Sequence, residues 1–223
     1  KKKTERKKKK KRKKKAKNIG QALMGFGMMF LGLKILNGGV PYMSQSESLK
    51  YFFTHYASIP IVGILLGAFV TAMVHSSAAT VGLVMVLAQA GLLDLQSAVC
   101  IMLGDNIGTC LTAQLASMTG NVNARRTAWA HTFYNLFGVI LTGITLPIFL
   151  KIVVAVTSHI QPNADITAYI ANSHTLFNSI NALIFLPLTN QYIAFLNKII
   201  TPKGSNHSKK IVLDKLEEKK STE

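Results

Sequence analysis

Charged residues are nearly absent from the long central part of this chain, and this feature constrains its fold more than any other. Residues 18–201 contain only ten charged side chains, most of them at the ends of apolar stretches. Over the whole chain, charged residues make up 16% of the sequence, whereas a soluble domain usually carries about 25%. Such a composition is typical of segments that cross a lipid bilayer. We therefore expect an all-α integral membrane protein.

The apolar stretches differ in length, and this difference predicts the type of bundle. Residues 18–36 are long enough to cross, and the Gly-Gly-Val-Pro run at 38–41 is expected to end this segment. A short amphipathic helix at the membrane interface is expected next, at 46–56. Several later stretches fall below the ~20 residues that a crossing needs. We therefore expect a polytopic bundle with broken helices and re-entrant hairpins; the short stretches are 58–74, 76–91, 95–104 and 107–118.

The net charge of +17 comes largely from the ends of the chain, because fourteen of the 26 Lys and Arg residues lie within 1–17. A basic run beside an apolar segment indicates a cytoplasmic anchor on anionic lipid. The run lacks the interleaved aromatic residues of nucleic-acid binders, so no nucleic-acid partner is expected. We predict a multi-pass protein of the plasma membrane whose two tails lie in the cytoplasm. Its segments are a basic tail or linker at 1–17, a transmembrane region at 18–200, and a polar tail at 201–223 that begins a regulatory helical domain.

Two polar interruptions mark the candidate site. His75, Ser76, Ser77 and Thr80 interrupt an apolar run, and polar groups at mid-membrane usually mark a substrate or ion path. The start of a broken helix suits phosphate or carboxylate, because its free N–H groups and dipole favour an anion. Downstream, Asn106 and Thr109 offer oxygens of the kind that coordinate Na⁺. The alternative remains open that these hydroxyls only bond to carbonyls of their own helices.

An internal repeat supplies the remaining candidates. The pattern His-Thr-x-x-Asn occurs at His131–Asn135 and again at His174–Asn178, which places His and Asn on one helical face in each copy. These four residues are expected to support the site or to pack between helices. No spacing typical of a metal site joins His75, His131 and His174, and no catalytic template is present. We therefore expect neither an enzyme nor a metal or organic cofactor.

These motifs resemble those of the sodium/phosphate cotransporter II family, in its bacterial branch. Members carry two inverted repeats, each with a Gln-Ser-Ser-Ser signature followed by Ala-Thr and then by Gly-x-Asn-Ile-Gly-Thr. This chain has His75-Ser-Ser-Ala-Ala-Thr80 and Gly104-Asp-Asn-Ile-Gly-Thr109, and the segment 123–135 is similar to the one that follows in the second repeat. The resemblance extends from Ile19 to about Ile200. It implies sodium-dependent transport of inorganic phosphate by a symporter that works by alternating access.

The departures from the family pattern define an alternative. His75 stands where the family has Gln, and Ala78 where it has the third Ser. One signature copy is present and the first methionine is Met24, which predicts one half of an inverted-repeat transporter whose partner is the missing first repeat or a second copy of the chain. The alternative is a non-transporting or degenerate membrane subunit that acts as a scaffold or a phosphate-signalling partner.

Overall fold

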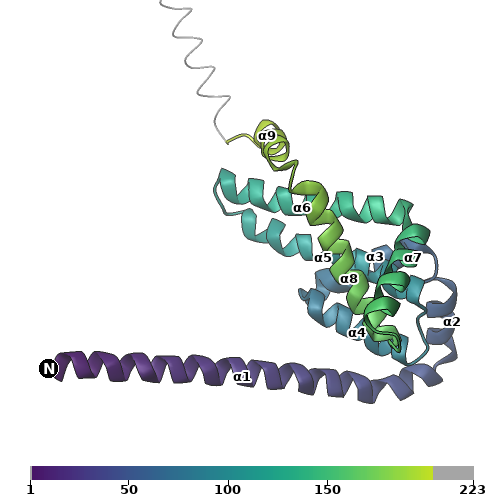
Figure 1. Cartoon of the computed structure of the whole chain (residues 1–223), viewed down its shortest axis with the longest axis horizontal. Coiled ribbons are helices and arrows are strands. Elements are labelled where there is room, and N and C mark those ends of the chain that lie inside the picture. The colour runs from purple at the N-terminus through teal and green to yellow at the C-terminus, as the bar shows by residue number, and fades with distance from the viewer. Residues whose placement is uncertain (1, 203–223) are drawn as a thin grey trace, which may run out of the picture.

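The computed structural model describes residues 2–202, which form nine α-helices and no strand (Figure 1). The expectation of an all-α architecture is confirmed. Two helical segments of the described chain are long and apolar enough to cross a membrane, or up to four if each of two bent pairs counts as one span. The predicted C-terminal tail lies, from residue 203 on, outside the described residues.

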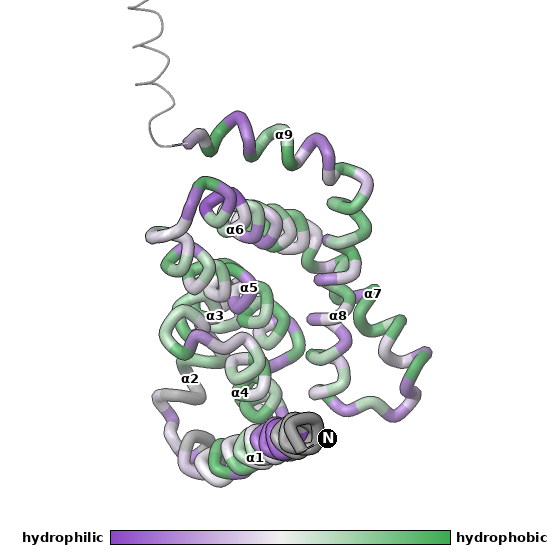
Figure 2. Tube along the Cα trace, turned by 90° about the vertical axis from the view of Figure 1, so that its left-hand side faces the viewer, coloured by the Kyte–Doolittle hydropathy of each residue, from purple (hydrophilic) through white to green (hydrophobic). Residues whose placement is uncertain are grey.

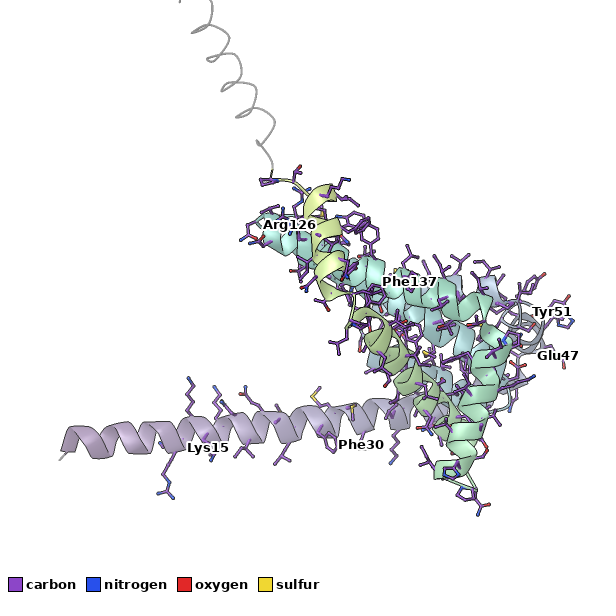
Figure 3. All side chains as sticks on the ribbon, turned by 45° about the horizontal axis from the view of Figure 1, so that its top comes forward. Lys15, Phe30, Glu47, Tyr51, Arg126 and Phe137 are labelled. Atoms are coloured by element: carbon purple, nitrogen blue, oxygen red, sulfur yellow. The ribbon has the colours of Figure 1, made fainter. Side chains whose placement is uncertain are left out.

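The first helix, α1 (Lys2–Gln45), is much longer than expected. The predicted end at residues 38–41 is wrong, since the helix continues through Pro41. Its apolar part, Arg12–Gly39, is a candidate span with none of its most apolar window buried in the described chain. The N-terminal part of the helix extends beyond the body of the molecule (Figure 1), and the side chains of Lys15 and Phe30 point into open space (Figure 3). Along the coloured part of the helix, hydrophilic residues come first and apolar residues follow toward α2 (Figure 2).

Three short helices follow: α2 (Glu47–His55), α3 (Pro60–Val74) and α4 (Ser77–Gln89). The first of them confirms a helix in the region predicted to be amphipathic. The other two have 15 and 13 residues, so neither reaches the ~20 residues that a crossing needs. The predicted interruption at His75 is therefore confirmed, and it divides one apolar region into two short helices.

Helix α5 (Leu95–Ser117) is the centre of the fold, and it is continuous over 23 residues. The predicted break between 104 and 109 is wrong. The polar residues there keep helical geometry because their side chains bond to carbonyls one turn back, as Asn106 Nδ2 does to Met102 O at 2.9 Å and Thr109 Oγ1 to Asp105 O at 2.9 Å. Of its most apolar window, 61% is buried, because α3, α4, α6 and α8 all pack against it.

Glycine explains how α3 and α5 approach so closely. A Cβ atom on Gly67 of α3 would overlap the Ile101 carbonyl, and one on Gly104 of α5 would overlap the Ile64 carbonyl. Small residues spaced four apart let helix backbones touch in a membrane, where apolar side chains gain nothing from leaving lipid. A Cβ atom on Gly108 would likewise crowd the Ala68 carbonyl of α3, so both glycines of the Gly-Asp-Asn-Ile-Gly motif serve helix packing.

The remaining chain consists of two bent pairs. Helix α6 (Val122–Ile144) meets α7 (Leu146–Ile160) at 91°, and α8 (Ile166–Phe185) meets α9 (Thr189–Ile199) at 82°. Pro147 lies in the first turn of α7, where proline is tolerated because its missing N–H would be unpaired there anyway. The expected kink near this proline is confirmed as a sharp bend.

Candidate phosphate and cation site

The junction of α3 and α4 consists of two residues, His75 and Ser76, that differ in backbone conformation. His75 has a left-handed backbone (φ 55°, ψ 27°), and its N–H donates to Thr71 O at 2.8 Å, which closes α3. Ser76 is extended and begins α4, its Oγ accepting from Ala79 N at 3.3 Å. Serine is favoured at this position because its oxygen satisfies one of the unpaired amides of the first turn. The junction therefore presents a helix N-terminus flanked by hydroxyl and imidazole groups.

Directly behind the junction lies a buried chain of polar contacts. The hydroxyls of Thr71 and Thr80 lie 2.8 Å apart, and Thr71 Oγ1 donates to Asp105 Oδ1 at 3.0 Å. The exposed fractions of Thr71, Thr80 and Asp105 are 1%, 2% and 0%. Thr80 Oγ1 also donates to Ser76 O at 3.3 Å. Three helices thus contribute to one network that links the Ser76 backbone to a carboxylate in the middle of α5.

A second contact joins the junction to α5 nearer the surface. His75 is exposed, and its Nδ1 lies 3.3 Å from Thr112 Oγ1. Asp105, Thr109 and Thr112 are spaced by four and three residues, so they share one face of α5. The face therefore carries polar groups from the buried carboxylate outward to the exposed histidine.

Asn106 lies on another part of α5 and is linked to α6. The Asn106 side-chain Nδ2 donates to Met102 O, and the Asn106 backbone carbonyl accepts from Cys110 Sγ at 3.2 Å. Asn135 Nδ2 of α6 in turn donates to Cys110 Sγ at 3.5 Å. Of the two residues predicted to bind sodium, Thr109 therefore belongs to the face that leads to the junction, while Asn106 belongs to a separate network between α5 and α6.

The two copies of the internal repeat have the same local geometry. Asn135 Nδ2 donates to His131 O at 3.0 Å, and Asn178 Nδ2 donates to His174 O at 2.9 Å. The copies also meet, because Tyr134 Oη in α6 donates to Asn178 O in α8 at 3.4 Å. The two copies thus lie at the contact between α6 and α8, where Tyr134 links the helices and the Asn amides bond within their own helices.

Sequence reasoning did not select Thr71 or Asp105 as site residues. The sequence does contain an indication that Asp105 is functional, because it is an acidic residue in the middle of an apolar stretch and such residues are candidate functional sites in membranes. The sequence contains no such indication for Thr71, because a lone threonine in an apolar helix is common. Only the packing of α3 against α5 reveals that Thr71 contacts the carboxylate.

A well-defined hollow among the described residues does not coincide with this site. It has a volume of about 410 Å³ and lies between α6, α8 and α9. Its lining is apolar and aromatic, with Phe137, Phe185 and Tyr192 among the contributors, and Phe137 points outward from α6 (Figure 3). An apolar hollow offers no groups for an anion, so we place the candidate site at the α3–α4 junction.

The fold and the site together define an all-α membrane protein whose polar groups gather at a break between two short helices. A family profile described as Na⁺/Pi-cotransporter matches residues 42–162, which include the junction and the whole of α3 to α7. The chain belongs to this family, which is a family of transporters and not of enzymes.

Similar proteins differ in how their names describe activity. The chain is 33% identical over 190 residues to the "Uncharacterized protein YqeW" of Bacillus subtilis, covering 84% of this chain and 59% of the relative. It is 26% identical over 185 residues to the "Putative inorganic phosphate export protein YjbB" of Escherichia coli, covering 83% and 33%. To the human "Sodium-dependent phosphate transport protein 2B" it is 28% identical over 127 residues, covering 53% and 18%. The chain therefore spans less than two thirds of these relatives. No solved structure matches it significantly.

Proposed function

We propose that this chain forms part of a transporter that carries inorganic phosphate across the plasma membrane, coupled to sodium, by alternating access. The observation that carries the proposal is the α3–α4 junction, where a helix N-terminus opens beside His75, Ser76 and Ser77. Helix N-termini bind phosphate because their first amides lack partners within the helix and the dipole favours negative charge. The family membership and the names of two relatives support phosphate as the anion.

Each residue of the junction has a role in this proposal. The hydroxyls of Ser76 and Ser77 and the His75 imidazole donate to phosphate oxygens. Thr80 was also predicted from the sequence to bind phosphate, but its side chain is 2% exposed. We therefore propose that it acts from behind, since its hydroxyl bonds the Ser76 carbonyl and so holds the backbone that presents the amides. Of the two residues predicted to bind sodium, Asn106 lies in the separate network between α5 and α6, and Thr109 is proposed to lie among the groups around sodium, the coupling ion. Its role is supported by the family description and by the names of the mammalian relatives.

The site is proposed to be completed by a second half, either the first repeat of a longer chain or a second copy of this one. The junction is open on one side, because His75 is exposed. The relatives are also longer, and this chain spans 59% or less of the three compared above. A second signature facing the first would enclose phosphate between two helix N-termini, in agreement with binding sites at the interface of transporter repeats.

The function is tested by phosphate flux. The purified full-length protein in proteoliposomes should move ³²P-phosphate faster in a sodium gradient than in a matched choline gradient. His75→Gln and Ala78→Ser, which bring in the residues of the family signature, should change the apparent affinity for phosphate while transport continues. If the native protein moves no phosphate in either gradient and the two substitutions restore flux, the degenerate-subunit alternative is correct instead.

The proposed topology has four crossings and both tails in the cytoplasm. The bent pairs each count as one span, and α3 and α4 return to the side from which they start. This arrangement places Arg125 and Arg126 inside, in agreement with the positive-inside rule. An impermeant maleimide should therefore label Asn163→Cys, in the exposed α7–α8 loop, in intact cells. Lys15→Cys and Lys198→Cys should react only after permeabilisation, and their labelling in intact cells would contradict the topology.

A further inference from the structure

Asp105 differs from the other acidic residues of the apolar region. Glu47 is the first residue of α2, while Asp94 and Asp165 cap α5 and α8 by accepting from backbone amides. Each of these carboxylates lies where a helix N-terminus favours negative charge. Asp105 lies halfway along α5 with an exposed fraction of 0%, so its position has no such explanation. It occupies the variable position of the Gly-x-Asn-Ile-Gly-Thr motif, so the resemblance assigns it no role.

The groups around Asp105 supply too few hydrogens. Its Oδ1 accepts from Thr71 Oγ1 at 3.0 Å. Three hydroxyls lie around Asp105, those of Thr71, Thr80 and Thr109. Their three hydrogens must serve four contacts: to Asp105 Oδ1, between the Thr71 and Thr80 hydroxyls, to the Ser76 carbonyl and to the Asp105 backbone carbonyl. Asp105 Oδ2 is buried and has no hydrogen-bond partner among residues 2–202. A buried carboxylate oxygen without a partner is costly, because it has lost water and gained nothing in return.

The neighbouring helices offer little positive charge to offset this. Neither α3 nor α4 contains a titratable residue. In α6, the basic residues are Arg125 and Arg126 in the first turns and His131 nearer the middle of the helix. On α8, His174 is the titratable group whose charge acts on Asp105. The centre of the network is therefore a cluster of oxygen atoms with one formal negative charge.

We propose that Asp105, together with the hydroxyl oxygens of Thr71 and Thr80, binds the sodium ion. One carboxylate carries one charge, which matches a monovalent cation. No group of three His, Cys, Asp or Glu side chains suited to a multivalent metal occurs in the described chain. The inference rests on the proposed function and adds a carboxylate to the cation site.

The same geometry connects the cation to phosphate. Thr80 contacts Thr71 on one side and the Ser76 carbonyl on the other. A sodium ion that orients the Thr80 hydroxyl therefore acts on the backbone at the start of α4, where phosphate is proposed to bind. In this scheme Thr80 is a positioning residue for the anion, and sodium should raise the affinity for phosphate. Phosphate should raise the affinity for sodium by the same factor, because coupling between two sites is reciprocal.

The test measures sodium binding directly and without phosphate. The purified full-length protein is titrated with ²²NaCl at constant ionic strength, with choline as the replacement cation. Asp105→Asn keeps the side-chain shape and one oxygen for Thr71 but removes the charge, so its affinity for sodium should fall at least tenfold. The matched control is Asp94→Asn, which keeps an oxygen at the α5 cap and should bind sodium as the native protein does.

A second pair of variants covers the case in which Asp105→Asn does not fold. Thr71→Val removes one proposed ligand and should weaken sodium binding several-fold, while Thr71→Ser keeps the hydroxyl and should restore it. Equal sodium affinity in the native protein, Asp105→Asn and Thr71→Val would overturn the proposal. So would a proton-release curve that sodium does not shift to lower pH, because a cation bound at Asp105 must compete with the proton of that carboxyl group. Sodium binding at Asp105 without phosphate flux would instead refute the transport function and leave the cation site standing.

Discussion

Replacing Gly104 with alanine should strongly destabilise the protein, because the glycine lies against the backbone of a neighbouring helix. The new Cβ would overlap the Ile64 carbonyl of α3, and a backbone atom cannot turn away as a flexible side chain can. Overpacking costs about 1–3 kcal/mol for each added methylene, and here two helices must separate. We expect the free energy of unfolding to fall by about 3 kcal/mol, at the upper end of this range. Such a change lowers the melting temperature by about 10 °C.

Thermal unfolding of the purified protein in detergent measures this effect. Gly67→Ala should behave in the same way, because its Cβ would meet the Ile101 carbonyl from the other side of the contact. The matched control is Gly25→Ala in α1, which adds the same methyl group where no atom lies within 4 Å. The control should be neutral or slightly stabilising, since alanine is favoured over glycine in a helix by about 1 kcal/mol. Equal melting temperatures for Gly104→Ala and Gly25→Ala would show that α3 and α5 are not packed as described.

Ser77→Ala should lower the apparent affinity for phosphate in transport about tenfold or more. Ser77 is the first residue of α4, so its hydroxyl lies at the helix end proposed to hold the anion. A hydrogen bond to a charged group contributes about 1.5–3 kcal/mol, and each 1.4 kcal/mol corresponds to about a factor of ten in affinity. The effect should appear mainly in the phosphate concentration needed for half-maximal flux.

Two variants separate this effect from general damage. Ser77→Thr keeps the hydroxyl and should retain most of the flux. Ser117→Ala removes a serine at the far end of α5, where the hydroxyl donates to Gln114 O within the same helix, and it should transport at the native rate. Sodium-driven phosphate flux in proteoliposomes is the measurement. If Ser77→Ala transports as well as Ser117→Ala, phosphate does not bind at the start of α4.

The two mistaken expectations about helix ends share a physical origin. Glycine and proline at 38–41 and the Gly-Asp-Asn-Ile-Gly run at 104–108 were both interpreted as breaks, because these residues are poor helix formers in water. In α5 the glycines instead create a surface flat enough for α3 to touch. Asp105 is held by Thr71, which is 34 residues away in the sequence. Contacts at such separations cannot be deduced from local propensity.

The sequence by itself determined the all-α membrane class, the family, the interruption at His75 and the repeat of His and Asn. These features follow from composition, from residue order and from spacing along one helix, all of which are local. Tertiary structure alone decided that α5 is unbroken and that Thr71, Thr80 and Asp105 meet behind the junction. The physical reason is that close packing at glycine brings polar groups of separate helices together, and a buried carboxylate acquires partners only when those helices meet.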